Sequence, residues 1–247
     1  MIRIFIISVT LISGLAILFS FNKKKMEKQI IAKNGFAVVE LFTSEGCSSC
    51  PPADEAVAEL QKEFPDNVFV LGFHVDYWDR LGWKDIYSNK VYTERQSHYA
   101  DAFSLSSIYT PQVVVNGEKE FVGSNRDRLS SAVRNELAFE PAATISLKTS
   151  VDKNNLSVTY NSTSKEKAII NFALVQLNTD TEVKRGENGG RKLHHINVVR
   201  DFKTVETNSG SVNFILPGGL TSKDVKVIAY VQERDGLKVV GAASLTL

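Results

Sequence analysis

Cys47 and Cys50 are the residues of this chain best suited to covalent chemistry. They lie in the segment Cys-Ser-Ser-Cys and are the only cysteines of the chain. No third cysteine of the chain can therefore compete for either sulfur atom. Two thiols at this spacing can form a reversible disulfide and exchange it with a partner disulfide. The pair predicts a redox site that needs no cofactor beyond its own disulfide.

The flanking residues predict how these cysteines are positioned. Residues 35–42 (GFAVVELF) form a short apolar run with the β-branched residues typical of a buried strand. After the cysteines, Pro51 suits the first turn of a helix, and Val57, Leu60 and Phe64 recur at helical spacing. A strand, a Cys-x-x-Cys and a helix in this order are typical of thioredoxins.

The start of a helix favours the thiolate form of a cysteine. Free N–H donors and the positive end of the helix dipole stabilise negative charge there, and they lower the pKa of the thiol. We therefore expect Cys47 to attack a partner disulfide and form a mixed disulfide. Cys50 is expected to resolve that intermediate by attacking Cys47.

Other roles for the cysteine pair are open at this point. A structural disulfide is one, although so short a loop removes little entropy from the unfolded chain. A metal site is another, but two thiolates need further ligands, and the histidines available are His74, His98, His194 and His195. We predict no metal ligands. A third role is a thioredoxin-like binding module whose cysteines are structural or vestigial.

The residues after the first helix extend the thioredoxin pattern. A second apolar run suits a strand covered on both faces, and Asn116-Gly117 is a strong hairpin signal. The expected elements are a strand at 68–75, a helical insertion at 76–108, strands at 112–115 and 120–122, and a helix at 125–139.

Tyr109, Thr110 and Pro111 immediately precede the strand expected at 112–115. A thioredoxin fold has its cis-proline in this loop, facing the dithiol. There the backbone of the residue before the proline pairs with a bound substrate segment. We therefore expect Thr110 and Pro111 to belong to the site, with Tyr109 as a substrate contact.

Four segments together resemble a known family. They are residues 40–54 (ELFTSEGCSSCPPAD), 74–85 (HVDYWDRLGWKD), 109–112 (YTPQ) and 186–201 (GENGGRKLHHINVVRD). The chain resembles, from about residue 35 to its end, the bacterial secreted thioredoxin-like family catalogued as domain of unknown function 1223. The resemblance implies a thioredoxin-like fold and site, but that family has no settled substrate.

Several polar residues of these segments are further site candidates. Glu40 lies near where thioredoxins bury an acid that helps to deprotonate the resolving cysteine, although a strand-end carboxylate is an equal alternative. Glu45 and Trp78 are candidate substrate contacts, and His74 is expected to be a packing residue. Thioredoxins carry an aromatic residue before the first cysteine. Here Gly46 takes that place, so partner docking is expected to differ.

Beyond Pro141 the pattern changes to short strands separated by Asn, Asp, Gly and Lys clusters. The expected strands are 144–149, 156–160, 168–177, 193–199, 211–216, 225–232 and 239–247. The predicted fold is an α/β thioredoxin-like domain at residues 33–140 followed by an all-β antiparallel sandwich domain at 141–247. The Gly-rich loop at 182–191 either borders the dithiol or packs between the domains.

The first residues bear on the compartment. Residues 4–21 form an apolar run after Arg3, which predicts a signal peptide or signal anchor within 1–25. We therefore expect a periplasmic or secreted protein, either released or held at the membrane by residues 4–21. A formal net charge of +1 without a basic patch argues against a nucleic-acid partner.

These observations favour a thiol–disulfide oxidoreductase of the cell envelope that acts on protein thiols or disulfides. The alternative is an envelope protein-binding module with a structural or vestigial cysteine pair. A copper or zinc carrier is the third hypothesis. The catalytic candidates are Cys47, Cys50, Thr110, Pro111 and Glu40, and the substrate-binding candidates are Glu45, Trp78 and Tyr109.

Overall fold

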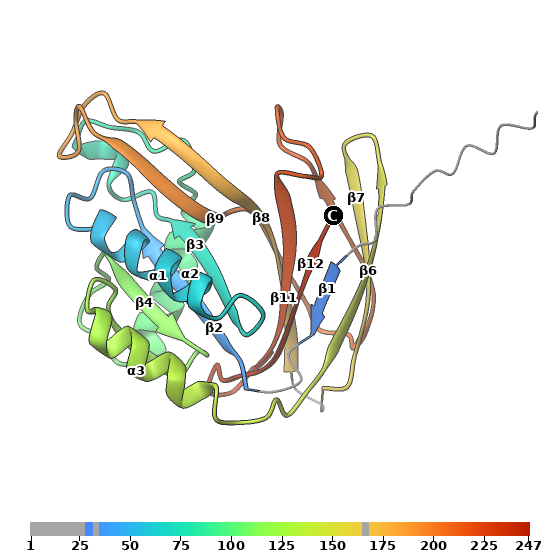
Figure 1. Ribbon diagram of the computed structural model, residues 1–247. Helices are drawn as coiled ribbons and strands as arrows, with labels where there is room; N and C mark the ends of the chain where they lie inside the picture. Colours follow the sequence, from blue (N-terminus) through green and yellow to red (C-terminus); the bar gives the residue numbers. More distant parts are fainter. Residues whose placement is uncertain (1–27, 32–34, 165–167) are drawn as a thin grey trace, which may run out of the picture.

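The computed structural model describes residues 28–31, 35–164 and 168–247 (Figure 1). A mixed nine-stranded sheet has the strand order β1-β12-β11-β8-β9-β3-β2-β4-β5, and a three-stranded sheet has the order β10-β7-β6. The signal peptide or anchor predicted within residues 1–25 lies outside the described residues. Within the described part of the chain, no helix has the length and apolar character needed to cross a membrane.

The first strands and helices form a sheet that is covered on both faces. The parallel strands β2 (Ala37–Thr43) and β3 (Val68–His74) are buried along their whole length. α1 (Pro51–Glu63) and α3 (Arg126–Glu136) pack on one face of this sheet, and α2 (Lys90–Ala102) packs on the other (Figure 1). Cover on both faces explains why the two strands read as continuous apolar runs.

The Asn-Gly hairpin signal is confirmed. β4 (Gln112–Val115) and β5 (Lys119–Val122) pair as antiparallel strands around it. Asn116 and Gly117 have φ values of 46° and 70°, which glycine and asparagine adopt most readily. A Cβ atom on Gly117 would lie 1.8 Å from the carbonyl oxygen of Leu237, so this turn also packs closely on the C-terminal part of the chain.

The segment at 76–108 is helical in two places. A 3-10 helix covers Asp79–Leu81, and α2 begins after Asn89, whose side chain accepts a hydrogen bond from the amide of Val91. Tyr92 and Tyr99 of α2 are buried against the sheet. These aromatic side chains belong to the core.

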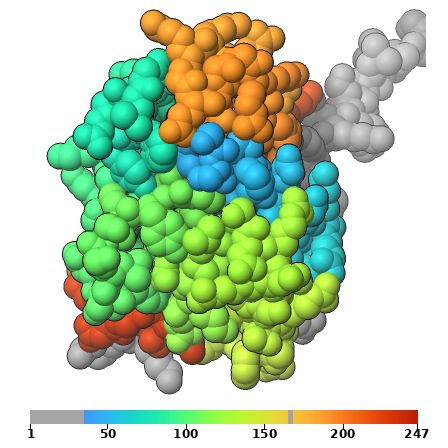
Figure 2. Space-filling model, turned by 90° about the vertical axis from the view of Figure 1, so that its left-hand side faces the viewer, coloured from blue at the N-terminus to red at the C-terminus, as the bar shows by residue number. Residues whose placement is uncertain are grey.

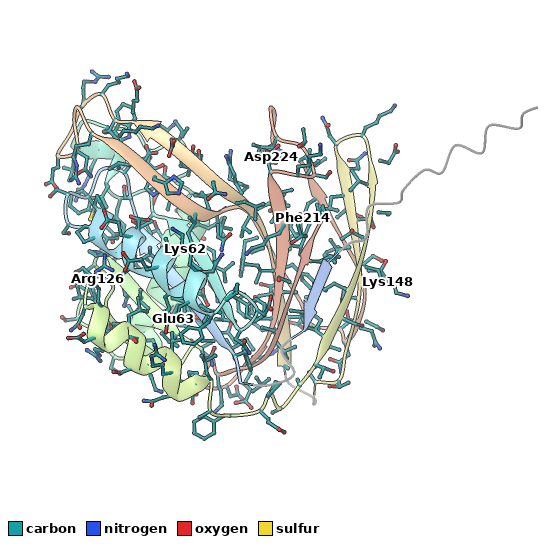
Figure 3. The ribbon with its side chains drawn as sticks, in the orientation of Figure 1. Lys62, Glu63, Arg126, Lys148, Phe214 and Asp224 are labelled. Atoms are coloured by element: carbon teal, nitrogen blue, oxygen red, sulfur yellow. A yellow bond between two sulfur atoms is a disulfide. The ribbon has the colours of Figure 1, made fainter. Side chains whose placement is uncertain are left out.

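The C-terminal part is entirely β-structure apart from its loops. Its strands are β6 (Ile145–Asp152), β7 (Asn155–Ser162), β8 (Ala168–Glu182), β9 (Lys192–Val205), β10 (Ser209–Ile215), β11 (Val225–Glu233) and β12 (Val239–Thr246). The described strand β1 (Lys28–Ile31) pairs with β12. β6, β7 and β10 form the smaller sheet, which packs on the larger one around buried residues such as Phe214 (Figure 3).

The C-terminal strands are continuous with the first sheet. β9 lies beside β3 in parallel, with Val198 opposite Gly72, while it pairs with β8 along its other edge. The aromatic core on the α2 face takes Phe42 and Phe73 from the first part and Tyr230 from β11. The molecule is therefore a mixed α/β sheet with a large β-rich portion, and its two parts share the apolar cluster on the α2 face.

Candidate active site

Cys47 and Cys50 lie between β2 and α1 and form a disulfide with a Cα–Cα distance of 5.4 Å. Cys50 is the N-cap of α1, and its carbonyl oxygen accepts hydrogen bonds from the amides of Ala53 and Asp54. Pro at the first two helical positions suits the local backbone but provides no N–H donor there. The helix dipole can thus stabilise a thiolate at this end of α1, but the two prolines cannot donate hydrogen bonds to it.

Both cysteines are inside the protein. Cys47 is 0% exposed and Cys50 is 1% exposed, whereas Ser48 and Ser49 between them are exposed. A macromolecular partner cannot reach either sulfur atom in this arrangement. Exchange with a partner therefore requires a local movement around the disulfide.

The tip of the β8–β9 hairpin, residues 183–191, covers the disulfide loop. The side-chain amide of Asn188 donates hydrogen bonds of 2.9 Å to the carbonyl oxygens of both Glu45 and Cys47, and Asn188 is 0% exposed. In Figure 2 this tip lies directly against the blue segment that contains the cysteines. Of the two placements expected for this loop, the structure shows the one beside the dithiol.

Glu187 makes a second contact from the same hairpin tip. Its carboxylate accepts hydrogen bonds from the amide and the hydroxyl of Ser48, at 3.1 and 2.7 Å. These bonds lower the pKa of Glu187. A negative charge therefore lies beside the segment between the two cysteines.

The Thr110–Pro111 peptide bond is cis, as expected for this loop of a thioredoxin-like fold. The indole N–H of Trp78 donates to the hydroxyl of Thr110 at 2.8 Å. A Cβ atom on Gly46 would lie 3.1 Å from the Cβ of Trp78. Trp78 therefore connects the cis-proline loop to the cysteine loop. Trp78 fills the space beside Gly46. In thioredoxins, the residue at this position before the first cysteine is itself aromatic.

Tyr109 is directed toward β5. Its hydroxyl donates to the carboxylate of Glu120 at 2.6 Å, and its carbonyl oxygen accepts from Gln96 at 2.7 Å. Burial, together with the bond to Glu120, raises the pKa of Tyr109. The side chain is half-buried, and its predicted substrate contact stays a prediction.

Glu40 is buried in an ion pair on the α2 face of the sheet. Its carboxylate accepts from the guanidinium of Arg95 at 2.5 and 2.8 Å, and from the hydroxyls of Tyr99 at 2.6 Å and Tyr230 at 3.2 Å. Its neighbours Val39 and Leu41 face α1, so Glu40 lies on the opposite face of β2. This geometry favours a structural role for Glu40. None of the contacts described for Glu40 supports a role in deprotonating Cys50.

Glu45 faces the interior of the site. It is 0% exposed, and one carboxylate oxygen accepts from the indole N–H of Trp83 at 2.7 Å. The other oxygen, Oε1, lies 4.0 Å from Nε2 of His195. A substrate contact, as predicted for Glu45, would require this side chain to leave its buried position.

A cluster of buried carboxylates and imidazoles surrounds Glu45. Nδ1 of His74 lies 2.6 Å from the carboxylate of Asp85, and Nδ1 of His195 lies 3.2 Å from that of Asp54. The two imidazole rings meet edge to face, 4.8 Å apart. His74 was expected to be a packing residue, but it belongs to a titratable cluster below the cysteine loop.

The surroundings shift the pKa values of Glu45, His195 and Asp85. Burial, reinforced by the charge of Asp85, raises the pKa of Glu45. Burial alone would disfavour the imidazolium form of His195, but the carboxylates of Asp54, Glu45 and Asp85 outweigh it and raise the pKa of His195. The pKa of Asp85 is lowered, because hydrogen bonds and the charge of His74 outweigh its burial.

Sequence reasoning missed Asp54, Asp85 and Arg95 as partners in the site. Asp54 has a local signal, since it lies one helical turn after Cys50 and shares its helix face. Asp85 and Arg95 have no such signal, because their partners come from other elements. Among the residues that the structure describes, no group of three or more His, Cys, Asp or Glu is arranged to hold a metal ion.

Comparison with known proteins gives a family and partial relatives. The profile of the family described as "Protein of unknown function (DUF1223)" matches residues 38–232. Thioredoxins of Methanothermobacter thermautotrophicus (a probable thioredoxin) and Methanocaldococcus jannaschii are each 28% identical over 100 residues, which is 40% of this chain and 94% of theirs. The X-ray structure of protein AGR_C_4864 from Agrobacterium tumefaciens is similar at a TM-score of 0.62 and 28% identity, covering 85% of this chain and 93% of that one.

Proposed function

The chain belongs to the DUF1223 family of proteins of unknown function, and we propose that it is a thiol–disulfide oxidoreductase. The observation that carries the proposal is the Cys47–Cys50 disulfide at the start of α1, beside the cis Thr110–Pro111 loop. Trp78 links the two loops through Gly46 and Thr110. The partial similarity to thioredoxins supports the same chemistry.

The proposed reaction is reversible exchange of two electrons with a partner. The Cys47 thiolate attacks one sulfur of a partner disulfide, an S–S bond forms between Cys47 and the partner, and the other partner sulfur leaves as a thiolate. Cys50 then attacks the sulfur of Cys47 and releases the second partner thiolate. The partner disulfide is reduced and the Cys47–Cys50 pair is oxidised to the form seen in the structure.

We also propose roles for the two parts of the chain, the kind of partner and the cellular compartment. Residues 33–140 act as a thioredoxin-like redox domain, supported by the thioredoxin similarity over part of the chain. Residues 141–247 act as the β-rich unit that closes the site through the β8–β9 hairpin. The partners are protein thiols or disulfides of the cell envelope. This placement is supported by the apolar run at 4–21 and by the isolated dithiol.

The burial of both sulfur atoms favours a second candidate function. A disulfide that is 0% and 1% exposed at its two cysteines also suits a structural bridge. The protein would then be an envelope binding module whose cysteine pair takes no part in turnover. The two candidates predict different stabilities of the disulfide toward reduction.

The equilibrium of the Cys47–Cys50 pair in glutathione buffers tests the proposal. The oxidised and reduced forms are separated by their mass after alkylation, and the thiolate pKa of Cys47 is read from the pH dependence of the alkylation rate. We expect a potential above about −300 mV and a Cys47 pKa below about 7.5, as in exchange-active dithiols. A lower potential with an unreactive thiol would favour the binding module. Cys47→Ser is expected to abolish turnover, and that variant serves as the negative control.

A further inference from the structure

We propose that the Asp54–His195 pair accepts the proton of the Cys50 thiol during disulfide exchange. The inference rests on the proposed oxidoreductase function and deepens it. Cys50 attacks only as a thiolate, so its proton must go to a nearby base. Glu40 is a poor acceptor, because Arg95 and two tyrosines occupy its carboxylate on the other face of the sheet.

Asp54 lies where an acceptor for Cys50 is needed. The two residues are four positions apart on α1, and side chains at this spacing lie on one face with Cβ atoms about 5–6 Å apart. The amide of Asp54 donates to the carbonyl oxygen of Cys50 at 3.2 Å. The side chain is nearly buried, at 9% exposure for the residue, and Thr43 donates to its Oδ2 at 3.2 Å.

His195 is the second member of the pair, and one of its two ring nitrogens has no hydrogen-bond partner. It is 2% exposed, its Nδ1 lies 3.2 Å from Oδ1 of Asp54, and its Nε2 has no hydrogen-bond partner. The nearest carboxylate oxygen to Nε2 is Oε1 of Glu45 at 4.0 Å, which also lacks a partner. Buried polar atoms without partners are costly, and a catalytic role is one explanation for such an atom in a native structure.

Four titratable groups from different segments lie around His195, and the ring of Tyr87 lies 6.4 Å from it. Asp54 comes from α1, Glu45 from the loop that follows β2, His74 from the end of β3, and Asp85 from the segment before α2. Three of these four groups are carboxylic acids. Their combined charge favours the imidazolium form of His195 and makes the pair a stronger base than a free imidazole.

A cavity connects the pair to the surface. Its volume is about 280 Å³, and Asp54 and His195 line it together with Pro51, which follows Cys50. The charged side chains of Lys62, Arg191 and Lys192 line the same cavity. A proton taken from Cys50 can therefore pass to solvent without crossing the apolar core.

The proposed step transfers one proton and replaces the S–S bond to the partner by the Cys47–Cys50 bond. In the mixed disulfide, the Cys50 thiol gives its proton to the carboxylate of Asp54, and the proton comes to rest on the neutral imidazole of His195. The Cys50 thiolate attacks the sulfur of Cys47, the Cys47–Cys50 bond forms, and the partner sulfur leaves with the electron pair of the broken bond. The partner thiolate takes a proton from solvent, and His195 returns one to solvent through the cavity.

The rate of this step is expected to depend on pH with a defined sign. Only neutral His195 can receive the proton, and the pKa of His195 is raised above 6.5. Release of the partner should therefore be slow below that pKa and should increase as the pH rises through it. In the opposite direction, where Cys50 must be reprotonated, the dependence on pH is reversed.

The experiment follows a single resolution event. Reduced protein is converted to a mixed disulfide between Cys47 and thionitrobenzoate, and release of the coloured thiol by Cys50 is recorded against pH. We expect His195→Gln and Asp54→Asn each to slow release at least about 10-fold and to remove the inflection, given that acid–base groups contribute about 10²–10⁴-fold. His98→Gln is the control, because His98 is exposed on α2, which packs on the opposite face of the sheet. It should release at the wild-type rate.

Unaltered protein gives a second measurement that does not depend on the folding of the variants. NMR titration of the His195 imidazole in the disulfide and dithiol forms should give two different pKa values, higher in the dithiol form where a thiolate lies nearby. The resonances of His98, on α2, serve as the reference and should be the same in both forms. Equal His195 titrations in the two forms, or wild-type release by both variants, would overturn the inference while leaving the oxidoreductase function intact. A wild-type protein that forms no mixed disulfide, or never resolves it, would overturn the function as well.

Discussion

At the scale of single residues, the Arg95–Glu40 ion pair is a buried charge interaction on the α2 face of the sheet. Arg95 donates to Glu40 and to Tyr230, and its guanidinium lies 4.8 Å from the ring centre of Phe202. It therefore joins α2 to β2, β9 and β11. Its charge is offset almost entirely by one carboxylate, whose side chain is 1% exposed. Removing one partner of such a pair destabilises the protein, because the other charge stays buried without a counter-charge.

Glu40→Gln should lower the free energy of unfolding by about 3–5 kcal/mol, because it leaves the Arg95 cation buried without a counter-charge. Urea unfolding followed by circular dichroism measures this change. Glu59→Gln is the matched control. Glu59 pairs with Arg126 on the surface of α1 and α3, where the side chains are 64% and 45% exposed, and its loss should cost less than about 1 kcal/mol.

The same variant separates the structural role of Glu40 from the catalytic role that the sequence predicted for it. If Glu40 only pairs with Arg95, folded Glu40→Gln protein should resolve a Cys47 mixed disulfide at the wild-type rate. A large slowing of that step in protein that remains folded would restore Glu40 as a proton acceptor for Cys50.

At the scale of elements, the β8–β9 hairpin controls access to the disulfide. β8 and β9 extend to residues 182 and 192, beyond the strand ends expected from the sequence pattern. This added length carries the tip at 183–191 over the cysteine loop. There Asn188 bonds to two carbonyl oxygens and Glu187 bonds to Ser48.

Asn188→Ala should speed reduction of the disulfide by dithiothreitol. The substitution removes the two hydrogen bonds that join the tip to the cysteine loop, worth about 0.5–1.5 kcal/mol each, so the open form of the tip should become about 5- to 150-fold more populated. The measurement is the rate of thiol appearance under native conditions. Asn213→Ala, at an exposed position of β10, is the control and should leave the rate unchanged. An unchanged rate in both variants would show that another movement exposes the cysteines.

At the scale of the whole molecule, the first and second parts of the chain share a sheet and a core. β9 joins the sheet beside β3, and the apolar cluster on the α2 face combines Phe42, Phe73 and Tyr230. The turn at Gly117 packs on the carbonyl of Leu237. Residues 33–140 therefore depend on residues beyond 141 for part of their packing.

Unfolding should consequently be one cooperative transition. The only tryptophans, Trp78 and Trp83, both lie beside the cysteine loop, so their fluorescence follows that part alone. Far-UV circular dichroism follows the strands of both sheets. The two probes should give the same urea midpoint. Two separate midpoints would instead indicate domains that unfold independently, divided near residue 140.

The sequence by itself determined the cysteine pair, the strand and helix around it, the Asn-Gly hairpin and the approximate positions of the strands from β2 to β12, but not β1 or the full length of β8 and β9. These features depend on residues close together in the chain, where hydrophobic period and turn preference act directly. It also predicted the cis-proline loop, through the resemblance to thioredoxins.

Only the tertiary structure decided what surrounds the disulfide. Asn188 is 141 residues from Cys47, His195 is 141 residues from Asp54, and Arg95 is 55 residues from Glu40. No local preference selects such partners, because they come from elements that are distant in the chain and meet only in the folded molecule. The burial of the cysteines and the charge of the groups beneath them are therefore properties of the folded sheet as a whole.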